Sequence, residues 1–248
     1  TLTISGGEPT VDPRLEQIIA AARRRGFHRF VLQTNGVLLE RAGLLDRLIK
    51  LGVRRYMVSF HSHQPGLYDR ITGSRGQFPQ AVRCLKRLLH TTHCRVIINV
   101  VVNAWNYKGL PELIDFIDEL CGRPSHRRRL AVCFSMINEI GLDKAPSWAV
   151  SLEAVAPYLR QAVVLCRRKG MRVSRSGSEC TFPACLLPNP GRFAARRPIP
   201  QSHVHYIDNV SGGADLIGRV KPLACRRCPY DLECPGVSAR YARMFGLR

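Results

Sequence analysis

The stretch VIINVVV at residues 96–102 is almost unbroken in apolar, mostly β-branched side chains. β-Branched residues favour extended backbone, and a run without polar alternation is typical of a strand that is buried on both faces. Strands of this kind occur in parallel sheets and βα barrels. Residues 96–102 therefore predict a parallel α/β fold.

The sequence on either side of this stretch repeats a strand followed by a helix. Strands are expected at residues 2–5, 30–34, 55–60, 96–102, 130–137 and 171–173, and helices at 12–25, 40–51, 81–89, 111–117 and 151–168. Strands that alternate with helices pair in parallel. The alternation fits either a barrel or an open doubly wound sheet. In both, ligands bind at the carboxyl ends of the strands.

Composition excludes several classes of protein. The 248 residues are 45% hydrophobic, which argues against intrinsic disorder, and no apolar run is long enough to span a membrane. Ten cysteines in so long a chain favour a reduced, cytoplasmic, metal-binding protein over a secreted disulfide scaffold. The net charge is +20, and most of the basic residues are arginine. The arginine clusters at residues 23–25 and 127–129 lie next to predicted helix ends, where cations are favoured, so no dedicated nucleic-acid surface is expected.

The texture of the sequence changes near residue 175, where prolines and cysteines replace the apolar runs. We therefore divide the chain into a core, residues 1–175, and a small irregular cysteine-rich extension, residues 176–248. In the extension, Cys225 and Cys228 are separated by two residues, and Cys234 follows five residues later. This spacing predicts a metal site, with Cys185 as the fourth ligand and Cys180 in reserve; four-thiolate zinc and iron–sulfur have the same spacing.

Glycine and polar residues follow the predicted strands. Gly6, Gly7, Glu8 and Pro9 come directly after the first strand. Paired glycines let a ligand approach the main chain, and a carboxylate can bind an ammonium group. The alternative is a tight strand-to-helix turn that Glu8 caps.

Three polar residues stand at the ends of later strands. Asn35 follows the second strand, Ser59 closes the third and Asn103 follows the fourth. They predict further contacts with a ligand at the same edge of the sheet. Ordinary strand-end capping is the alternative for Ser59 and Asn103.

The residues at these strand ends resemble those of radical S-adenosylmethionine (radical SAM) enzymes. The matching segments are TISGGEPT at residues 3–10, TNG at 34–36, Ser59, DRITG at 69–73 and residues 99–103, so the resemblance covers most of residues 1–175. It implies a partial (β/α)6 TIM-like barrel. It also implies that Gly6, Gly7, Glu8 and Pro9 bind the methionine amino group of S-adenosylmethionine.

The resemblance assigns roles to the other polar residues and to the tail. Ser59 would contact the carboxylate or ribose of the cofactor, Asn103 would lie near its ribose or adenine, and Asn35 would shape the floor of the site. The tail resembles the auxiliary-cluster region of radical SAM maturases, which implies a second [4Fe-4S] cluster. Its ligands would be Cys185, Cys225, Cys228 and Cys234.

One departure from the family is serious. The family binds its catalytic [4Fe-4S] cluster through a C-x3-C-x2-C motif, and no two cysteines here are separated by three residues. We expect that the barrel lacks its first βα unit, which would carry this motif upstream of Thr1, and that the fragment is inactive alone.

The full-length parent would cleave S-adenosylmethionine reductively to methionine and a 5′-deoxyadenosyl radical. That radical would abstract hydrogen from a peptide or small-molecule substrate, with electrons from a reductant such as flavodoxin or ferredoxin. The alternative is a noncatalytic α/β binding module with a zinc-stapled tail and a basic surface.

Overall fold

The larger sheet has six strands, all parallel, in the order β1-β2-β3-β4-β5-β6. The computed structural model describes residues 1–136, 147–174, 182–188, 204–207, 218–232, 234 and 236–246. The strands are β1 (Leu2–Ile4), β2 (Phe30–Thr34), β3 (Val53–Ser59), β4 (Arg95–Val102), β5 (Leu130–Met136) and β6 (Arg172–Ser174). Their order in space follows the order in the chain, as in a βα barrel, whereas a doubly wound sheet reverses direction at a switch point. The sheet is therefore consistent with a partial TIM-like barrel.

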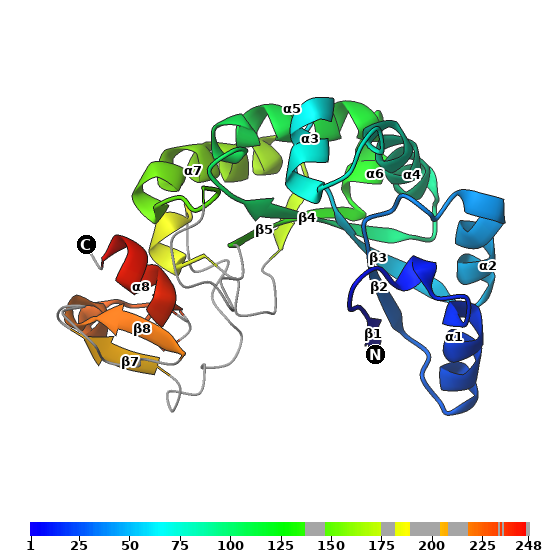
Figure 1. Ribbon diagram of the computed structural model, residues 1–248, viewed down its shortest axis with the longest axis horizontal. Helices are drawn as coiled ribbons and strands as arrows, with labels where there is room; N and C mark the ends of the chain where they lie inside the picture. The colour runs from blue at the N-terminus through cyan, green and yellow to red at the C-terminus, as the bar shows by residue number, and fades with distance from the viewer. Residues whose placement is uncertain are drawn as a thin grey trace.

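The sheet forms an arch, and the helices of the core cover its convex face (Figure 1). These helices are α1 (Leu15–Arg24), α2 (Leu44–Lys50), α3 (Pro65–Thr72), α4 (Phe78–His90), α5 (Leu110–Cys121), α6 (Pro124–Arg127) and α7 (Leu152–Arg168). In α4, Ala81, Cys84, Leu85 and Leu88 are fully buried, and this spacing places them on one face of the helix. That face packs into the main hydrophobic cluster, which extends from α1 to α7.

Burial alternates along β4, which corrects part of the prediction made from residues 96–102. Val96, Ile98, Val100 and Val102 are buried, whereas the residues between them are only half-buried. Every residue of β5 except Met136 is buried, so β5 is the strand that is covered on both faces. The concave face is therefore more accessible over β4 than over β5.

The second helix starts later than its sequence pattern suggests. We expected it over residues 40–51, but α2 begins at Leu44, after a 3-10 turn over Arg41–Gly43. Ala42 and Gly43 have φ angles of 47° and 69°, in the left-handed region, and an α-helix does not run through such residues.

The extension is more regular than predicted. It contains a three-stranded sheet of β7 (Val204–Ile207), β8 (Arg219–Pro222) and β9 (Val237–Ser238), followed by α8 (Ala239–Phe245). β8 pairs with β7 in parallel and with β9 antiparallel. Strands of two to four residues are too short to show a period in the sequence.

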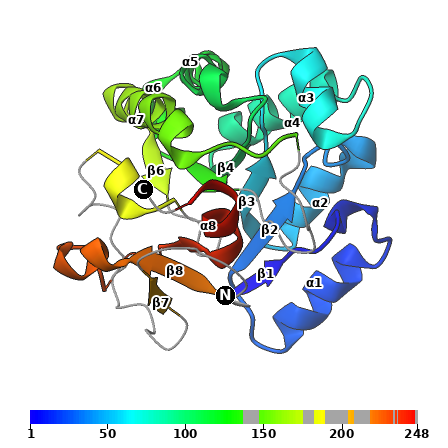
Figure 2. The ribbon, with the colours of Figure 1, turned by 60° about the vertical axis from the view of Figure 1, so that its left-hand side comes forward.

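The extension lies beside the β5–β6 end of the arch (Figures 1 and 2). The Tyr241 hydroxyl of α8 accepts a hydrogen bond of 2.7 Å from the backbone N–H of Leu152, the first residue of α7. The Arg160 guanidinium, also on α7, donates to the carbonyl oxygens of Cys185 and Leu186. Helix α7 thus holds two separate segments of the extension against the core.

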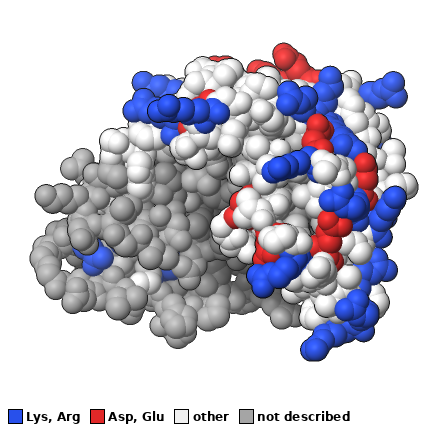
Figure 3. Space-filling model, turned by 45° about the vertical axis from the view of Figure 1, so that its right-hand side comes forward, with Lys and Arg blue, Asp and Glu red and all other residues white. Residues whose placement is uncertain are grey.

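Charges of both signs are interspersed on the face of the core drawn in Figure 3. Ion pairs join neighbouring helices: Arg47 on α2 to Glu16 on α1 at 3.0 Å, and Arg87 on α4 to Asp46 on α2 at 2.7 Å. On this face, many basic side chains therefore lie next to acidic ones. None of the helices in the described ranges combines the length and apolarity needed to cross a membrane.

Candidate functional site

The loop after β1 exposes its main chain at two glycines. Gly6 and Gly7 have φ angles of 97° and 47°, a region that favours glycine. Both are exposed, and a Cβ added to either would meet no atom within 4 Å. Their N–H and C=O groups are therefore accessible at the edge of the sheet.

The Glu8 carboxylate ties this loop to the end of β2. Its Oε1 accepts hydrogen bonds from the Thr10 backbone N–H (3.0 Å), the Thr10 hydroxyl (2.6 Å) and the Thr34 hydroxyl (2.7 Å). Its Oε2 accepts from the Asn35 backbone N–H at 2.6 Å. Glu8 caps the 3-10 turn Pro9–Val11, in which Pro9 is buried. The capping role considered from the sequence is thus present, and the half-buried carboxylate lies next to the two open glycines.

Thr34 is a site residue that the sequence analysis left without a role. It is buried, and besides donating to Glu8 its hydroxyl accepts from the Gly36 backbone N–H at 3.0 Å. The neighbouring Asn35 side chain accepts from the Val37 N–H at 2.9 Å, which closes an Asx turn. The signal was the position of Thr34 as the last residue of a strand, directly before Asn35.

Ser59 ends β3 and begins a polar row across the concave face. The strand register places Ser59 beside Asn99 on β4, and Asn99 beside Cys133 on β5. The Ser135 hydroxyl donates to the Asn99 side-chain oxygen at 2.7 Å and lies 3.8 Å from the Cys133 sulfur. Asn99 is the single polar residue in residues 96–102. That exception in an apolar run is the signal by which the sequence marks Asn99.

Asn103 is buried inside the turn that follows β4. Its side-chain oxygen accepts from the Trp105 N–H at 2.9 Å, and its own N–H donates to the side-chain oxygen of Asn106 at 2.8 Å. The Asn106 amide then donates to the carbonyl oxygens of Val101 (2.9 Å) and His61 (3.0 Å). Asn103 therefore acts as a strand-end cap in this structure, which is the alternative raised from the sequence.

His61 completes the link between the β3 and β4 ends. Its Nδ1 accepts a hydrogen bond of 3.2 Å from the Val101 backbone N–H, so the ring is neutral with its proton on Nε2. Burial lowers the pKa of His61 to about 4. The ring thus acts as a structural acceptor between two strand ends.

The four cysteines predicted to bind a metal line one cavity in the extension. Its volume is about 600 Å³, and its walls include Cys185, Cys225, Cys228 and Cys234. Cys225 lies in the 3-10 turn Leu223–Arg227, and the Cys228 N–H donates to its carbonyl oxygen at 2.9 Å. Cys180 lies outside the described residues. Within the described part of the chain, no three His, Cys, Asp or Glu side chains form a group that could hold a metal ion.

Hydrogen bonds to sulfur join the Cys185 segment to Cys234. The Cys234 sulfur accepts from the backbone N–H groups of Ala184 at 3.5 Å and Gly236 at 3.4 Å. Burial, and then the neighbouring Cys234, raise the pKa of the Cys185 thiol. The same two causes raise the pKa of Cys225.

Gly236 allows the Cys234 loop to approach β8. Its φ angle is 69°, and a Cβ at this position would lie 2.3 Å from the Val220 carbonyl oxygen. A side chain there would displace the strand. The glycine two residues after Cys234 is therefore required by the backbone.

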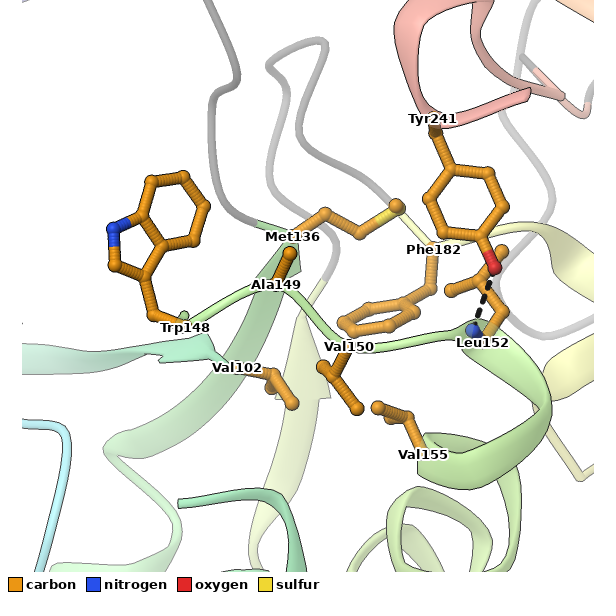
Figure 4. Close-up of a pocket in the computed structure, with 9 residues that line it drawn as sticks. All are labelled: Val102, Met136, Trp148, Ala149, Val150, Leu152, Val155, Phe182 and Tyr241. Atoms are coloured by element: carbon orange, nitrogen blue, oxygen red, sulfur yellow. Dashed lines mark hydrogen bonds between the residues drawn. The ribbon is translucent and has the colours of Figure 1, made fainter. Parts of the chain in front are cut away.

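A second, much smaller cavity lies where the extension meets the core. It has a volume of about 20 Å³, and Val102, Met136, Trp148, Phe182 and Tyr241 are among the residues around it (Figure 4). These residues come from the ends of two core strands, from the segment before α7 and from the extension.

Comparisons of the sequence with known proteins identify a family to which it is similar. Residues 1–117 match the radical SAM superfamily. The chain is 29% identical over 119 residues to a probable GTP 3′,8-cyclase of Methanocaldococcus jannaschii, covering 48% of this chain and 39% of that protein. It is 31% identical over 111 residues to a PqqA peptide cyclase of Granulibacter bethesdensis, covering 45% and 29%.

A third relative extends further along the chain. Fe-coproporphyrin III synthase of Methanosarcina barkeri is 30% identical over 187 residues, covering 75% of this chain and 42% of that protein. The matched region thus spans less than half the length of each of these three relatives. The match over residues 1–117 includes the β1 to β4 ends described above. The chain belongs to the radical SAM superfamily.

Proposed function

We propose that this chain binds S-adenosylmethionine at the β1 to β4 strand ends and an auxiliary [4Fe-4S] cluster in the cavity of the extension. The whole protein would be an iron–sulfur oxidoreductase of the maturase type in a reducing compartment such as the cytoplasm. The single observation that carries the proposal is the Glu8 network beside two open glycines at the end of β1.

The strand-end residues suit a cofactor that carries both an ammonium and a carboxylate. Gly6 and Gly7 present free main-chain groups, and Glu8 supplies a negative charge that four hydrogen bonds hold in place. Charge-assisted hydrogen bonds to such a carboxylate are stronger than neutral ones. Asn35 would line the same site at the end of β2, and Ser59 would line it at the end of β3. Asn103 would support the site from within its turn.

The donors in the extension suit an iron–sulfur cluster. Four thiols line a cavity of about 600 Å³, and N–H groups donate to the sulfur of Cys234. Iron–sulfur clusters are held by cysteine thiolates and tuned by hydrogen bonds to sulfur. Cys185, Cys225, Cys228 and Cys234 would be the ligands. With all four positions filled by cysteine, we propose an electron-transfer role for this site.

The bound cofactor would supply a 5′-deoxyadenosyl radical for hydrogen abstraction. The half-buried polar row of Ser59 and Asn99 would then face a substrate on the concave side of the sheet. The names of the relatives point to a nucleotide, a peptide and a porphyrin. We therefore propose a peptide or small-molecule substrate, and a reductant such as flavodoxin or ferredoxin as partner.

Binding of S-adenosylmethionine by the anaerobically purified chain tests the strand-end site. Glu8→Gln should raise the Kd roughly 10-fold to 100-fold, the loss of about 1.5–3 kcal/mol expected for a hydrogen bond to a charged group. Glu16→Gln is the control, because Glu16 makes a surface ion pair on α1. Titration calorimetry measures both variants. Equal affinity of Glu8→Gln and the wild type would remove Glu8 from the site.

Reconstitution with iron and sulfide tests the extension. A brown protein that absorbs near ~400 nm would support a cluster. Stoichiometric zinc without colour would favour the alternative of a zinc-stapled binding module. This measurement needs no turnover, so it does not depend on the C-x3-C-x2-C motif that is absent from residues 1–248.

A further inference from the structure

A lysine is buried in the wall of the four-cysteine cavity. Lys221 lies on β8, and 1% of its surface is exposed. It lines the cavity together with Cys225, Cys228 and Cys234. Transfer of an ammonium group out of water costs several kcal/mol, so lysine is almost never fully buried unless it is paired. Its presence beside the cysteines calls for a physical reason.

Lys221 holds the loop that connects two of the cysteines. Its Nζ donates to the Asp231 carbonyl oxygen at 2.6 Å and to the Asp231 side-chain Oδ1 at 2.9 Å. The Asp231 N–H donates to the Cys228 carbonyl oxygen at 3.0 Å, and the Cys234 N–H donates to the Tyr230 carbonyl oxygen at 2.8 Å. One ammonium group therefore fixes the middle of the loop whose two ends carry Cys228 and Cys234.

The pair also brings two opposite charges to the wall of the same cavity. The Asp231 side chain is 16% exposed and the Lys221 side chain 1%, so water screens the pair weakly. The reduction potential of an iron–sulfur cluster depends on the charges around it, on hydrogen bonds to sulfur and on solvent exposure. Removing the Lys221 charge would make the cavity wall more negative by one charge, and removing the Asp231 charge would make it more positive by one.

We propose that Lys221 is a positioning residue for the auxiliary cluster: through Asp231 it fixes the loop that presents Cys228 and Cys234, and the balance of the two charges sets the reduction potential. This inference rests on the proposed function of the extension. It gives a residue of β8 a role that cannot be predicted from the spacing of the cysteines.

Opposite shifts in the reduction potential distinguish this role from a purely structural one. The whole chain is reconstituted anaerobically with iron and sulfide, and the potential is measured by a redox titration followed by electron paramagnetic resonance. Lys221→Met should lower the potential, because the cavity wall becomes more negative by one charge. Asp231→Asn should raise it, because the ammonium remains and both oxygen acceptors are kept. Lys221→Arg should restore the potential most of the way to the wild-type value.

Lys86→Met is the matched control for loss of a lysine. Lys86 is exposed on α4 in the core, away from the cavity, so this change should leave the potential and the iron content at their wild-type values. If Lys221→Met loads little iron, that loss supports the positioning role. Asp231→Asn, which retains the hydrogen-bond geometry, then decides the effect of charge.

Two results would overturn the inference, and they differ in what else they overturn. A wild-type chain that loads a cluster, with unchanged potentials in Lys221→Met and Asp231→Asn or shifts of the same sign, removes only the role of Lys221. A wild-type chain that takes up no iron and sulfide overturns the proposed function of the extension, and this inference with it.

Discussion

The core and the extension differ in what stabilises each of them. The core buries one continuous apolar cluster that begins at Leu15 on α1 and also takes in Phe182 and Leu187 of the extension. Five other described residues of the extension form a separate cluster: Val220, Val237, Ala239, Tyr241 and Ala242. So small a cluster contributes little burial free energy, and small domains of this kind usually need a metal or disulfides. We therefore expect the core to fold by burial, and the extension to depend in addition on the metal site proposed above.

Removal of the metal ligands should produce the largest difference between the two regions. In Cys225→Ser/Cys228→Ser we expect loss of bound iron and loss of amide-exchange protection over residues 218–246, because binding free energy of a metal site is folding free energy. Protection in β2 to β5 should stay at its wild-type level. Hydrogen exchange followed by mass spectrometry measures both regions in one sample. Unchanged protection of the extension would mean that its own packing suffices.

A substitution that creates a cavity in the core should have the opposite effect: it should destabilise the core and leave the iron content unchanged. Leu85 is fully buried on α4, and Leu85→Ala should lower the free energy of unfolding by about 2–5 kcal/mol. Iron content per folded chain should not change, because α4, which carries Leu85, lies at the opposite end of the arch from β8 and α8 (Figure 1). Denaturant unfolding and iron analysis test the two halves of this prediction. A parallel loss of iron would show that the two regions are energetically coupled.

Acid should weaken the core through His61. The folded pKa of about 4 lies below the unfolded value of about 6.5, so the neutral ring contributes its full stability above pH ~6.5. That contribution, up to about 3 kcal/mol, is lost as the pH falls from ~6.5 to ~4.

The pH dependence is measured by denaturant unfolding at several pH values. His61→Leu should flatten the dependence over this range, and His28→Asn, at an exposed position, should leave it as in the wild type. An equally steep decline in His61→Leu would assign the acid sensitivity to other groups.

The smallest expected effect concerns the contact between the two regions. Tyr241→Phe removes the hydroxyl that accepts from the Leu152 N–H, at a cost of about 1 kcal/mol. We expect faster amide exchange at the start of α7 and in α8, with no change in β2 to β4. Exchange rates that stay at wild-type values at both sites would show that apolar packing alone holds the junction.

Much of the core could be predicted from the sequence, because its signals are local. β4 and β5 lie in long, mostly apolar stretches, and the longer helices show an amphipathic period. The five cysteines of the core, Cys84, Cys94, Cys121, Cys133 and Cys166, are all buried. The start of α2 was wrong because one alanine adopts a left-handed conformation. The small sheet of the extension was not predicted, because its strands of two to four residues are too short to show a period in the sequence.

The sequence predicts where the candidate site lies but not the contacts within it. Glu8 and Asn35 were chosen for their positions at strand ends. The bonds that hold them come from residues remote in sequence, such as Thr34, which is 26 residues from Glu8. His61 and Val101 are 40 residues apart, and no pattern in the sequence joins them. Lys221 was overlooked because a lysine in a short strand has no signal of burial.

Gly236 has a consequence for how the extension can evolve. With the Val220 carbonyl oxygen 2.3 Å from where a Cβ would be, the backbone itself selects the amino acid at this position. In a saturation library of residues 218–246 scored by folding, we expect only glycine to be accepted at position 236. Tolerance elsewhere in β9 and α8 would then be set by side-chain volume.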